Sequence, residues 1–374
     1  MKEYLDIVNK ILDEGEYKPN RTGIGAYTIA GAMFQHDMSK GFPLLTTKQM
    51  PFKGISSELE FFIKGITDKK WLQDKKNYIW DEWASVQLLQ DRMSMLKINK
   101  EDSESPIDYG AYMAMMWFEY KNNNRNQDDT IKITPKIKNA IEEIKNSGYF
   151  RKPEDMFIDT DSFNTEFIKQ PDKHLEDKII KLGQLLERDL GPIYGWQWRH
   201  FGAKYDDHTT DYTGQGIDQL ANVVNTLKKN PNDRRMIVTA WNPADVPKMG
   251  LPACHYGFQV TVINDKLNLL WNQRSVDTML GLPFNIASYG LLLHILAKQS
   301  GLKEGTLTGF LADVHIYENQ VNGAKEQISR DPKKYSLPKI TTDNFNSIFD
   351  WEYKNTTLND YESYPKIDFG KVAV

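Results

Sequence analysis

Residues 258–300 read FQVTVINDKLNLLWNQRSVDTMLGLPFNIASYGLLLHILAKQS. Two strand-like runs, 258–263 and 266–271, come first. A long apolar stretch follows and approaches the length of a membrane span, but polar or helix-bending residues interrupt it: Pro283, Asn285, Ser288 and His294. We therefore predict a buried central helix, with a helical pattern over 286–300.

Outward from this stretch, the chain alternates between further strands and helices. Strand-like runs occur at 26–38 and 236–240, and helical patterns occur at 55–65 and 217–229. Helices and strands that mix in this way, without a regular alternation, favour an α+β fold.

Residues 85–188 differ in composition from the rest of the chain. They are more polar and rich in Lys and Asn, with helical patterns at 137–146 and 174–188. Long insertions are well tolerated at protein surfaces. We therefore predict a core formed by residues 1–84 and 189–374, and an inserted, partly helical small domain to which the sequence assigns no role.

The composition excludes several classes of protein. The 374 residues carry 47 basic and 51 acidic side chains, a formal net charge of −4, and 40% of the residues are hydrophobic. These values are typical of a globular protein. The slightly acidic balance argues against a protein whose affinity depends on neutralising nucleic-acid phosphates or anionic lipid.

The cellular compartment is predicted from the N-terminus and from cysteine usage. The N-terminus places Leu5, Val8, Ile11 and Leu12 at helical spacing, which indicates an amphipathic helix rather than a signal peptide. The single cysteine, Cys254, excludes internal disulfides and a Cys-rich metal site, which suits a reducing compartment. We expect a cytoplasmic protein without a membrane span, from a low-GC bacterium or its phage.

Cys254 stands in the sequence Leu-Pro-Ala-Cys-His-Tyr, directly before a predicted strand. A lone cysteine is often a small buried hydrophobic residue. It becomes a nucleophile where nearby positive charge stabilises the thiolate. The segments Asp233-Arg-Arg235 and Gln273-Arg-Ser275 flank it in the sequence, and if these strands pair, guanidinium groups converge on the sulfur.

Four arginines are candidates for one anion site. Adjacent arginines are usually solvated surface charge, which is the alternative for Arg234 and Arg235. Arg274, in contrast, stands in an otherwise apolar and amide-rich run, where an unpaired charge is costly. Because guanidinium groups match phosphate bidentately, we predict that Arg21, Arg234, Arg235 and Arg274, with the Ser275 hydroxyl, form a phosphomonoester cradle.

Five more side chains have both a structural and a functional interpretation. Glu58 is a helix cap or exposed acid or, if buried, an acid/base whose pKa is raised toward neutrality. His315 and Tyr317 point to the same side of a predicted strand, which suits either hydroxyl recognition or core hydrogen bonding. Trp80 and Trp83, three apart on a predicted helical face, are core or a ligand platform. No zinc-ligand spacing or phosphate-binding loop appears.

Ten segments taken together resemble the thymidylate synthase family, and nearly the whole chain outside 85–188 takes part. The segments are Asn20-Arg-Thr-Gly23, Pro43-Leu-Leu-Thr-Thr-Lys48, Ile79-Trp-Asp-Glu-Trp83, Gly191-Pro-Ile-Tyr-Gly195, Asp233-Arg-Arg235, Cys254-His255, Gln273-Arg-Ser-Val-Asp277, Leu280-Gly-Leu-Pro-Phe-Asn-Ile-Ala-Ser-Tyr289, Asp313-Val-His-Ile-Tyr317 and Val372-Ala-Val374. Agreement at so many ordered positions is not expected by chance.

The resemblance implies an α+β, thymidylate synthase-like fold, with a mostly buried mixed sheet packed by helices and a sheet-to-sheet homodimer. It also implies the substrates, dUMP and 5,10-methylenetetrahydrofolate, without a metal. A cysteine thiolate adds to C6 of dUMP, and C5 then attacks the methylene carbon of the folate. Reduction of the transferred carbon gives dTMP and dihydrofolate.

The same resemblance implies a role for each matching residue. The catalytic residues are Cys254 as the nucleophile, Glu58, His255, Tyr194, Asn285 and Asp277. The substrate-binding residues are Arg21, Gln273, Arg274, Ser275, Asn285 for the base, and His315 and Tyr317 for the sugar 3′-hydroxyl, with Arg234 and Arg235 reaching the phosphate site of the other subunit. The folate-binding residues are Lys48, Trp80, Trp83, Asp277, Leu280, Gly281, Phe284 and Val374.

The chain departs from the family pattern at several positions, among them Gln49, Glu60, Asn272 and Ala312. Glu60, Asn272 and Trp196 also resemble phage deoxycytidylate hydroxymethylase, which adds water to the exocyclic methylene instead of reducing it. An added carboxylate near the site orders water, whereas a dry pocket favours hydride. Because Asn285 argues for uracil, the alternative is a deoxyuridylate hydroxymethylase.

Two rivals come from other classes of protein. A cysteine hydrolase also pairs Cys with His but gives the four arginines no common task. A nucleic-acid-binding role is disfavoured by the acidic balance, so no obligatory nucleic acid is expected.

Overall fold

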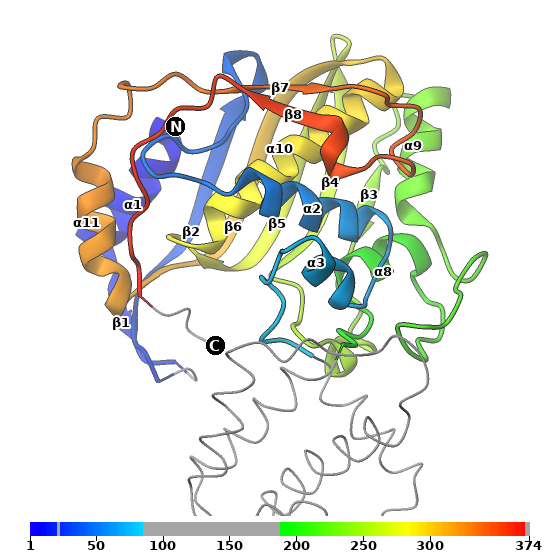
Figure 1. Ribbon diagram of the computed structural model, residues 1–374, viewed down its shortest axis with the longest axis horizontal. Helices are drawn as coiled ribbons and strands as arrows, with labels where there is room; N and C mark the ends of the chain where they lie inside the picture. Colours follow the sequence, from blue (N-terminus) through cyan, green and yellow to red (C-terminus); the bar gives the residue numbers. More distant parts are fainter. Residues whose placement is uncertain (21–22, 85–187, 371–374) are drawn as a thin grey trace, which may run out of the picture.

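A six-stranded sheet lies at the centre of the computed structural model, which describes residues 1–20, 23–84 and 188–370 (Figure 1). The strand order is β1-β2-β6-β5-β4-β3, with β5 and β6 parallel and the other neighbours antiparallel. Its strands are β1 (Glu16–Lys18), β2 (Ala26–Asp37), β3 (Ile237–Thr239), β4 (His255–Ile263), β5 (Lys266–Asp277) and β6 (Lys303–Tyr317). The mixed sheet and its helices confirm the predicted α+β class.

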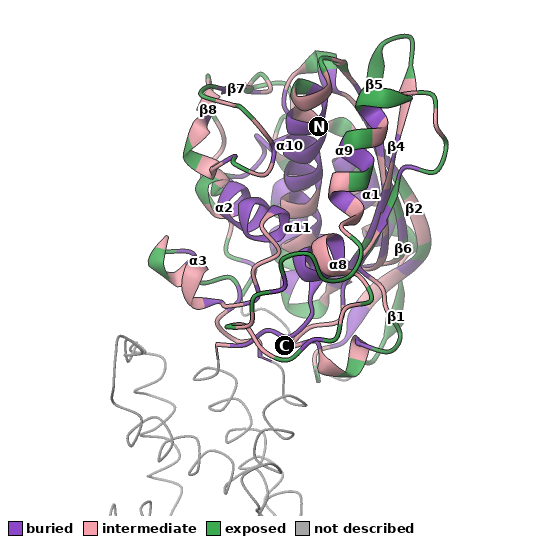
Figure 2. Cartoon of the chain, turned by 90° about the vertical axis from the view of Figure 1, so that its right-hand side faces the viewer, coloured by how far each residue is buried: buried purple, intermediate pink, exposed green. Residues whose placement is uncertain are grey.

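Helices cover one face of this sheet. The described α-helices are α1 (Lys2–Glu14), α2 (Phe52–Ile63), α3 (Lys70–Asp74), α8 (Tyr194–His200), α9 (Gln219–Lys229), α10 (Gly281–Ser300) and α11 (Val321–Ser329). In Figure 2 they lie on one side of the strands, and the other side of the sheet faces outward. On that open face Met33 and Phe310, paired across β2 and β6, are 59% and 44% exposed.

The central helix α10 is buried along most of its length, as predicted, but it begins five residues earlier than predicted. Asp277 Oδ1 accepts hydrogen bonds from the backbone N–H groups of Met279 (3.1 Å) and Leu280 (3.0 Å), which satisfies donors ahead of the first turn. Pro283 stands in that first turn, where its missing N–H costs little. Among the described residues no helix is long and apolar enough to cross a membrane.

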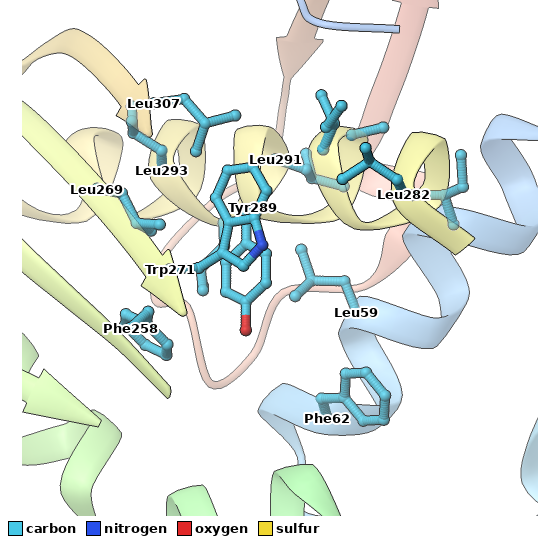
Figure 3. Close-up of a cluster of buried hydrophobic side chains, with 14 of the residues drawn as sticks. Leu59, Phe62, Phe258, Leu269, Trp271, Leu282, Tyr289, Leu291, Leu293 and Leu307 are labelled. Atoms are coloured by element: carbon cyan, nitrogen blue, oxygen red, sulfur yellow. The ribbon is translucent and has the colours of Figure 1, made fainter. Parts of the chain in front are cut away.

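A stacked aromatic pair joins α10 to the sheet. The rings of Trp271 on β5 and Tyr289 on α10 lie 5.3 Å apart and 10° from parallel (Figure 3). Gly309, the β6 partner of Trp271, makes room for the indole, since a Cβ at this position would lie 2.4 Å from Trp271 Cζ2. The packing of α10 on β5 therefore depends on a glycine in the neighbouring strand.

The chain after β6 returns across the helical side. It forms α11, the antiparallel pair β7 (Lys339–Thr342) and β8 (Thr356–Asn359), and the 3₁₀ turn η8 (Tyr353–Asn355). A chain of hydrogen bonds fixes this pair to α10: His294 Nε2 lies 3.0 Å from Thr342 Oγ1, and His294 Nδ1 lies 2.6 Å from Glu304 on β6.

The prediction that Trp80 and Trp83 share a helical face is wrong, because residues 78–83 form turns. The buried Lys69 ammonium accounts for this geometry, since it donates to the carbonyls of Asp81 (2.9 Å) and Trp83 (3.1 Å). Carbonyls bonded in this way are not available to a helix. Arg21, Val374 and residues 85–187 lie outside the described residues, so the inserted domain stays a prediction.

We expect Gly309→Ala to destabilise the fold by about 1–3 kcal/mol, because the methyl group overlaps the Trp271 ring and displaces the contact with Tyr289. Urea unfolding followed by tryptophan fluorescence measures the change. Gly54→Ala in the first turn of α2 is the matched control: its Cβ would meet neighbours only at 4.0 Å, so helix propensity should stabilise this variant by up to about 1 kcal/mol. Equal effects of the two substitutions would contradict the packing argument.

Candidate active site

Cys254 lies immediately before β4, held by contacts from two other segments. Its backbone N–H donates to the hydroxyl of Tyr194, the first residue of α8 (2.8 Å), and its carbonyl accepts from the Arg274 N–H on β5 (2.9 Å). The thiol is half-buried, and Arg274 Nη2 lies 3.9 Å from Sγ. A guanidinium beside a thiol stabilises the thiolate, which is the nucleophilic form.

Carbonyl groups orient the Arg274 guanidinium. Its Nε donates to Ala253 (3.0 Å) and its Nη2 donates to Pro252 (2.8 Å), and the group lies 5.4 Å from the centre of the Trp241 ring. These acceptors are neutral carbonyl groups, so no carboxylate neutralises the guanidinium charge at these contacts. The group therefore keeps its attraction for an anion next to the sulfur.

The other arginines of the predicted cradle lie differently. Arg234 and Arg235 are exposed just before β3, and Arg235 pairs with Asp233 at 2.6 Å. Of the predicted cradle residues that the structure describes, Arg274 is the one seen to contact the Cys254 sulfur within the same chain. The Ser275 side chain is half-buried on β5, two residues from the buried Gln273.

Glu58 is a buried acid on α2, not an exposed one. Glu58 is only 8% exposed, and its Oε1 accepts a hydrogen bond from the Trp80 indole (2.8 Å). Burial raises the pKa of Glu58 to about 7, and the bond from Trp80 opposes that rise. A carboxyl group with this pKa exchanges a proton near neutral pH.

His255 is a neutral imidazole at the start of β4. Burial lowers its pKa to about 3, and its Nδ1 lies 3.0 Å from the Tyr289 hydroxyl. Its ring lies 4.4 Å from that of Tyr194, which in turn stacks on Phe62 at 4.8 Å. Tyr289 was not singled out from the sequence, although its spacing of four from Asn285 on one helix was an available signal.

Asn285 and Gln273 form a pair between α10 and β5. Gln273 Nε2 donates to Asn285 Oδ1 (3.0 Å) and to the Ser275 carbonyl (3.1 Å), and Gln273 Oε1 accepts from the Trp271 indole (3.1 Å). The buried Gln273 thereby fixes the half-buried Asn285 amide. A fixed amide offers one donor and one acceptor to a planar ligand.

His315 and Tyr317 lie together near the end of β6, as the sequence predicted. Their rings are 5.0 Å apart, and His315 Nδ1 lies 3.2 Å from Asp313 Oδ1. Asp313 also pairs with Lys18 of β1 at 2.6 Å, and these partners hold the pKa of Asp313 below its usual value despite partial burial. Carboxylate contact at Nδ1 orients the imidazole and leaves Nε2 for a ligand.

Five of the residues predicted for folate lie at the N-terminus of α10 or contact it: Lys48, Asp277, Leu280, Gly281 and Phe284. Leu280 and Gly281 begin the helix and Phe284 follows in its first turn, half-buried. Lys48 is buried: its Nζ donates to the Met279 carbonyl and lies 4.6 Å from the centre of the Phe369 ring. Burial lowers the pKa of Lys48 to about 8.

Comparison with known proteins agrees with this arrangement. A family model described as thymidylate synthase matches residues 2–374. A bifunctional dihydrofolate reductase-thymidylate synthase from Paramecium tetraurelia is 36% identical over 372 residues, which cover 100% of this chain and 61% of that protein. The chain thus spans less than two thirds of the Paramecium protein.

Bacterial relatives match along their whole length. A thymidylate synthase from Listeria monocytogenes serotype 4b is 35% identical over 370 residues, covering 98% of each chain, and one from Listeria innocua has the same identity and coverage. A match to the family over nearly the whole chain, with relatives of this identity, establishes membership. The chain belongs to the thymidylate synthase family.

Proposed function

We propose that the protein transfers the one-carbon unit of 5,10-methylenetetrahydrofolate to C5 of dUMP with reduction, giving dTMP and dihydrofolate. The observation that carries this proposal is the Cys254 thiol within 3.9 Å of a guanidinium that pairs with no carboxylate at its described contacts. A nucleophile and an anion site in contact suit a phosphorylated substrate that is attacked covalently.

In this proposal the Cys254 thiolate adds to C6 of the pyrimidine and makes C5 a carbon nucleophile. C5 forms a bond to the folate methylene, loses its proton, and the folate nitrogen leaves. Hydride from the resulting tetrahydrofolate then converts the exocyclic methylene to a methyl group, and the bond between sulfur and C6 breaks. Glu58 moves protons through water, since its pKa lies near neutrality.

The remaining residues orient the two substrates. Asn285, held by Gln273, reads O4 and N3 of uracil, and His315 and Tyr317 bind the sugar 3′-hydroxyl. His255 and Tyr194 support the cysteine segment and the water network near Glu58. Lys48, Asp277 and the first turn of α10 hold the folate, with Trp80, Trp83 and Val374 completing that site.

A deoxyuridylate hydroxymethylase is the second candidate, because Glu60, Asn272 and Trp196 depart from the synthase pattern. The surroundings of these residues favour reduction. Glu60 has both oxygens engaged, by Lys64 (2.6 Å) and by the backbone N–H of Tyr353 (2.9 Å). These two contacts orient the buried carboxylate toward Lys64 and the η8 turn.

The other two departures are placed by contacts of their own. Asn272 pairs with Phe310 and so lies on the open face of the sheet, opposite Gln273. Trp196 packs in a separate cluster with Tyr205 and Tyr212, at ring distances of 5.2 and 5.5 Å. These positions support treating the departures as local packing differences.

The protein is further proposed to act as a homodimer through the open face of the sheet. Met33 and Phe310 present apolar surface there, and such patches commonly mark interfaces. Arg234 and Arg235, exposed before β3, would reach the phosphate site of the other subunit and complete the cradle that Arg274 begins.

The first test mixes the protein with dUMP and methylenetetrahydrofolate, follows dihydrofolate by absorbance near 340 nm, and determines the nucleotide mass. We expect dTMP and dihydrofolate in equal amounts. A product heavier than dTMP by one oxygen, without dihydrofolate, would establish the hydroxymethylase instead. Glu60→Gln should leave the product unchanged, and Cys254→Ser should abolish turnover. Full activity of the serine variant would contradict the covalent mechanism.

The second prediction concerns Glu58. A carboxyl pKa raised from 4.5 to about 7 means that the folded protein loses stability as pH rises through this interval, because the unfolded state ionises first. Glu58→Gln removes the effect, so its stability relative to wild type should grow between about pH 4.5 and 7 and reach up to about 3 kcal/mol. Urea unfolding across this range measures it.

Trp80→Phe is the matched control for this measurement. It removes the donor that lowers the pKa of Glu58, so the midpoint of the pH dependence should move to higher pH. A stability difference between Glu58→Gln and wild type that does not change with pH would contradict the raised pKa.

The third prediction tests the shared phosphate site. Cys254→Ser and the double variant Arg234→Ala/Arg235→Ala should each be inactive, but refolding an equal mixture should regain up to about a quarter of wild-type sites. Half of the dimers are then mixed, and each mixed dimer has one intact site. If no activity returns while sedimentation shows mixed dimers, the arginines do not act across the interface.

A further inference from the structure

The segment from Phe42 to Pro51, here the 42–51 loop, is mostly buried although it is neither helix nor strand. Thr46, Thr47 and Lys48 are only 3%, 2% and 6% exposed. Buried backbone groups need hydrogen-bond partners, and an irregular segment supplies few of them itself. Many partners of this loop come from two stretches that follow β6 in the sequence.

Helix α11 and Arg330, which directly follows it, supply the first set of partners. Gln327 Nε2 donates to Thr47 Oγ1 (2.9 Å), and Arg330 Nη1 donates to the Thr47 carbonyl (2.7 Å). Gln327 is fully buried, and the Arg330 side chain is 10% exposed. The residue directly before Lys48 is thus held through both its side chain and its backbone.

The chain after β8 supplies the second set. The Tyr361 hydroxyl donates to the Leu45 carbonyl (2.8 Å) and accepts from the Met50 N–H (2.8 Å), and the Tyr364 N–H donates to the Thr46 carbonyl (2.9 Å). Both ends of the 42–51 loop are therefore tied to one short stretch of the C-terminal segment.

Arg330 joins the two sets of partners. Besides Thr47 it donates to the Pro365 carbonyl through the same Nη1 (2.7 Å), its Nη2 pairs with Glu326 at 2.5 Å, and its guanidinium lies 5.3 Å from the centre of the Tyr364 ring. One side chain thereby links the 42–51 loop, helix α11 and the C-terminal segment. Charge-assisted bonds to buried carbonyls are among the stronger hydrogen bonds.

The same assembly also fixes the Lys48 ammonium. Phe369, 3% exposed, packs so closely on α11 that a Cβ on Gly323 would lie 2.7 Å from its ring, and the Lys48 ammonium lies 4.6 Å from the ring centre. In Figure 1 the chain that follows β8 descends beside α11, toward the C-terminus. Arg330 holds this descending chain at Pro365, four residues before Phe369.

We propose that Arg330 is a positioning residue for the folate substrate: it locks the loop that carries Lys48 to the C-terminal segment, so that the ammonium is presented in one place to an anionic group of the folate. This inference rests on the proposed function. Preorganisation of this kind lowers the entropic cost of binding.

The effect should be confined to one of the two substrates. The residues proposed for dUMP are fixed by contacts within the sheet and α10, such as those of Gln273 with Asn285 and of Arg274 with Pro252. The contacts of Arg330 lie instead on the 42–51 loop and the C-terminal segment. Loss of Arg330 should therefore weaken folate binding and leave dUMP binding intact.

The test compares steady-state kinetics of wild type, Arg330→Met and Arg330→Lys. We expect the KM for methylenetetrahydrofolate to rise about tenfold in Arg330→Met, with the KM for dUMP and its Kd by calorimetry changed less than twofold. Arg330→Lys, which keeps the charge and can donate to one carbonyl, should recover part of the loss. Lys325→Met, an exposed position on the same helix, is the matched control and should match wild type.

Equal increases in both KM values, or a fall in kcat alone, would overturn the positioning role. If Arg330→Met fails to fold, Glu326→Gln tests the same point more gently, because it frees Nη2 of Arg330; a folate KM unchanged from wild type in that variant would also count against the proposal. Failure of the proposed function is distinct, since wild type itself would then form no dTMP.

Discussion

The docking of α10 on β5 through Trp271 and Tyr289 is the contact on which the site depends. The stacked rings set the rotation of the helix, and Tyr289 then reaches His255 at the start of β4 while Asn285, one turn earlier, reaches Gln273. Residues four apart share a helix face, so a single orientation serves both contacts. A shift of the helix would disturb the contacts of the Asn285 amide and of His255 together.

Burial gives the polar groups of the site their chemical character. Desolvation raises the pKa of Glu58 into the neutral range and lowers that of His255 far below it, so one group exchanges protons near pH 7 and the other stays neutral. Each has an identified hydrogen-bond partner, the Trp80 indole and the Tyr289 hydroxyl. The same burial that shifts these groups limits the access of water to them.

Much of the architecture could be predicted from the sequence, because apolar periodicity reports local burial directly. The strand predicted at 266–271 is real but continues to Asp277. Its polar end pairs with β4 as far as Gln273 and with β6 as far as Asp277, which a local pattern cannot reveal. Trp80 was misassigned to a helix because its turn is imposed by Lys69, a residue from another segment.

Some residues of the candidate site could be predicted from the sequence, and others could not. Motifs identified Cys254 and Arg274, whose residue types carry their chemistry in any context, and the structure brings them together. Arg330 gave no signal, because its importance comes from carbonyls that lie more than thirty residues away on either side. Supporting residues whose partners are backbone groups are recognised from coordinates and not from sequence.

The pairing of β2 with β6 has a consequence for how the chain tolerates its long middle segment. These strands are neighbours in the sheet although more than two thirds of the chain separates them, so folding must close a very large loop in any case. Closure entropy grows only with the logarithm of loop length. Residues 85–188 lengthen this loop by less than a doubling, which adds no more than about 0.6 kcal/mol to the closure cost. The topology thus lets evolution vary the length of this segment with little thermodynamic penalty, whereas the same number of residues between β4 and β5 would separate two strands joined by a tight turn.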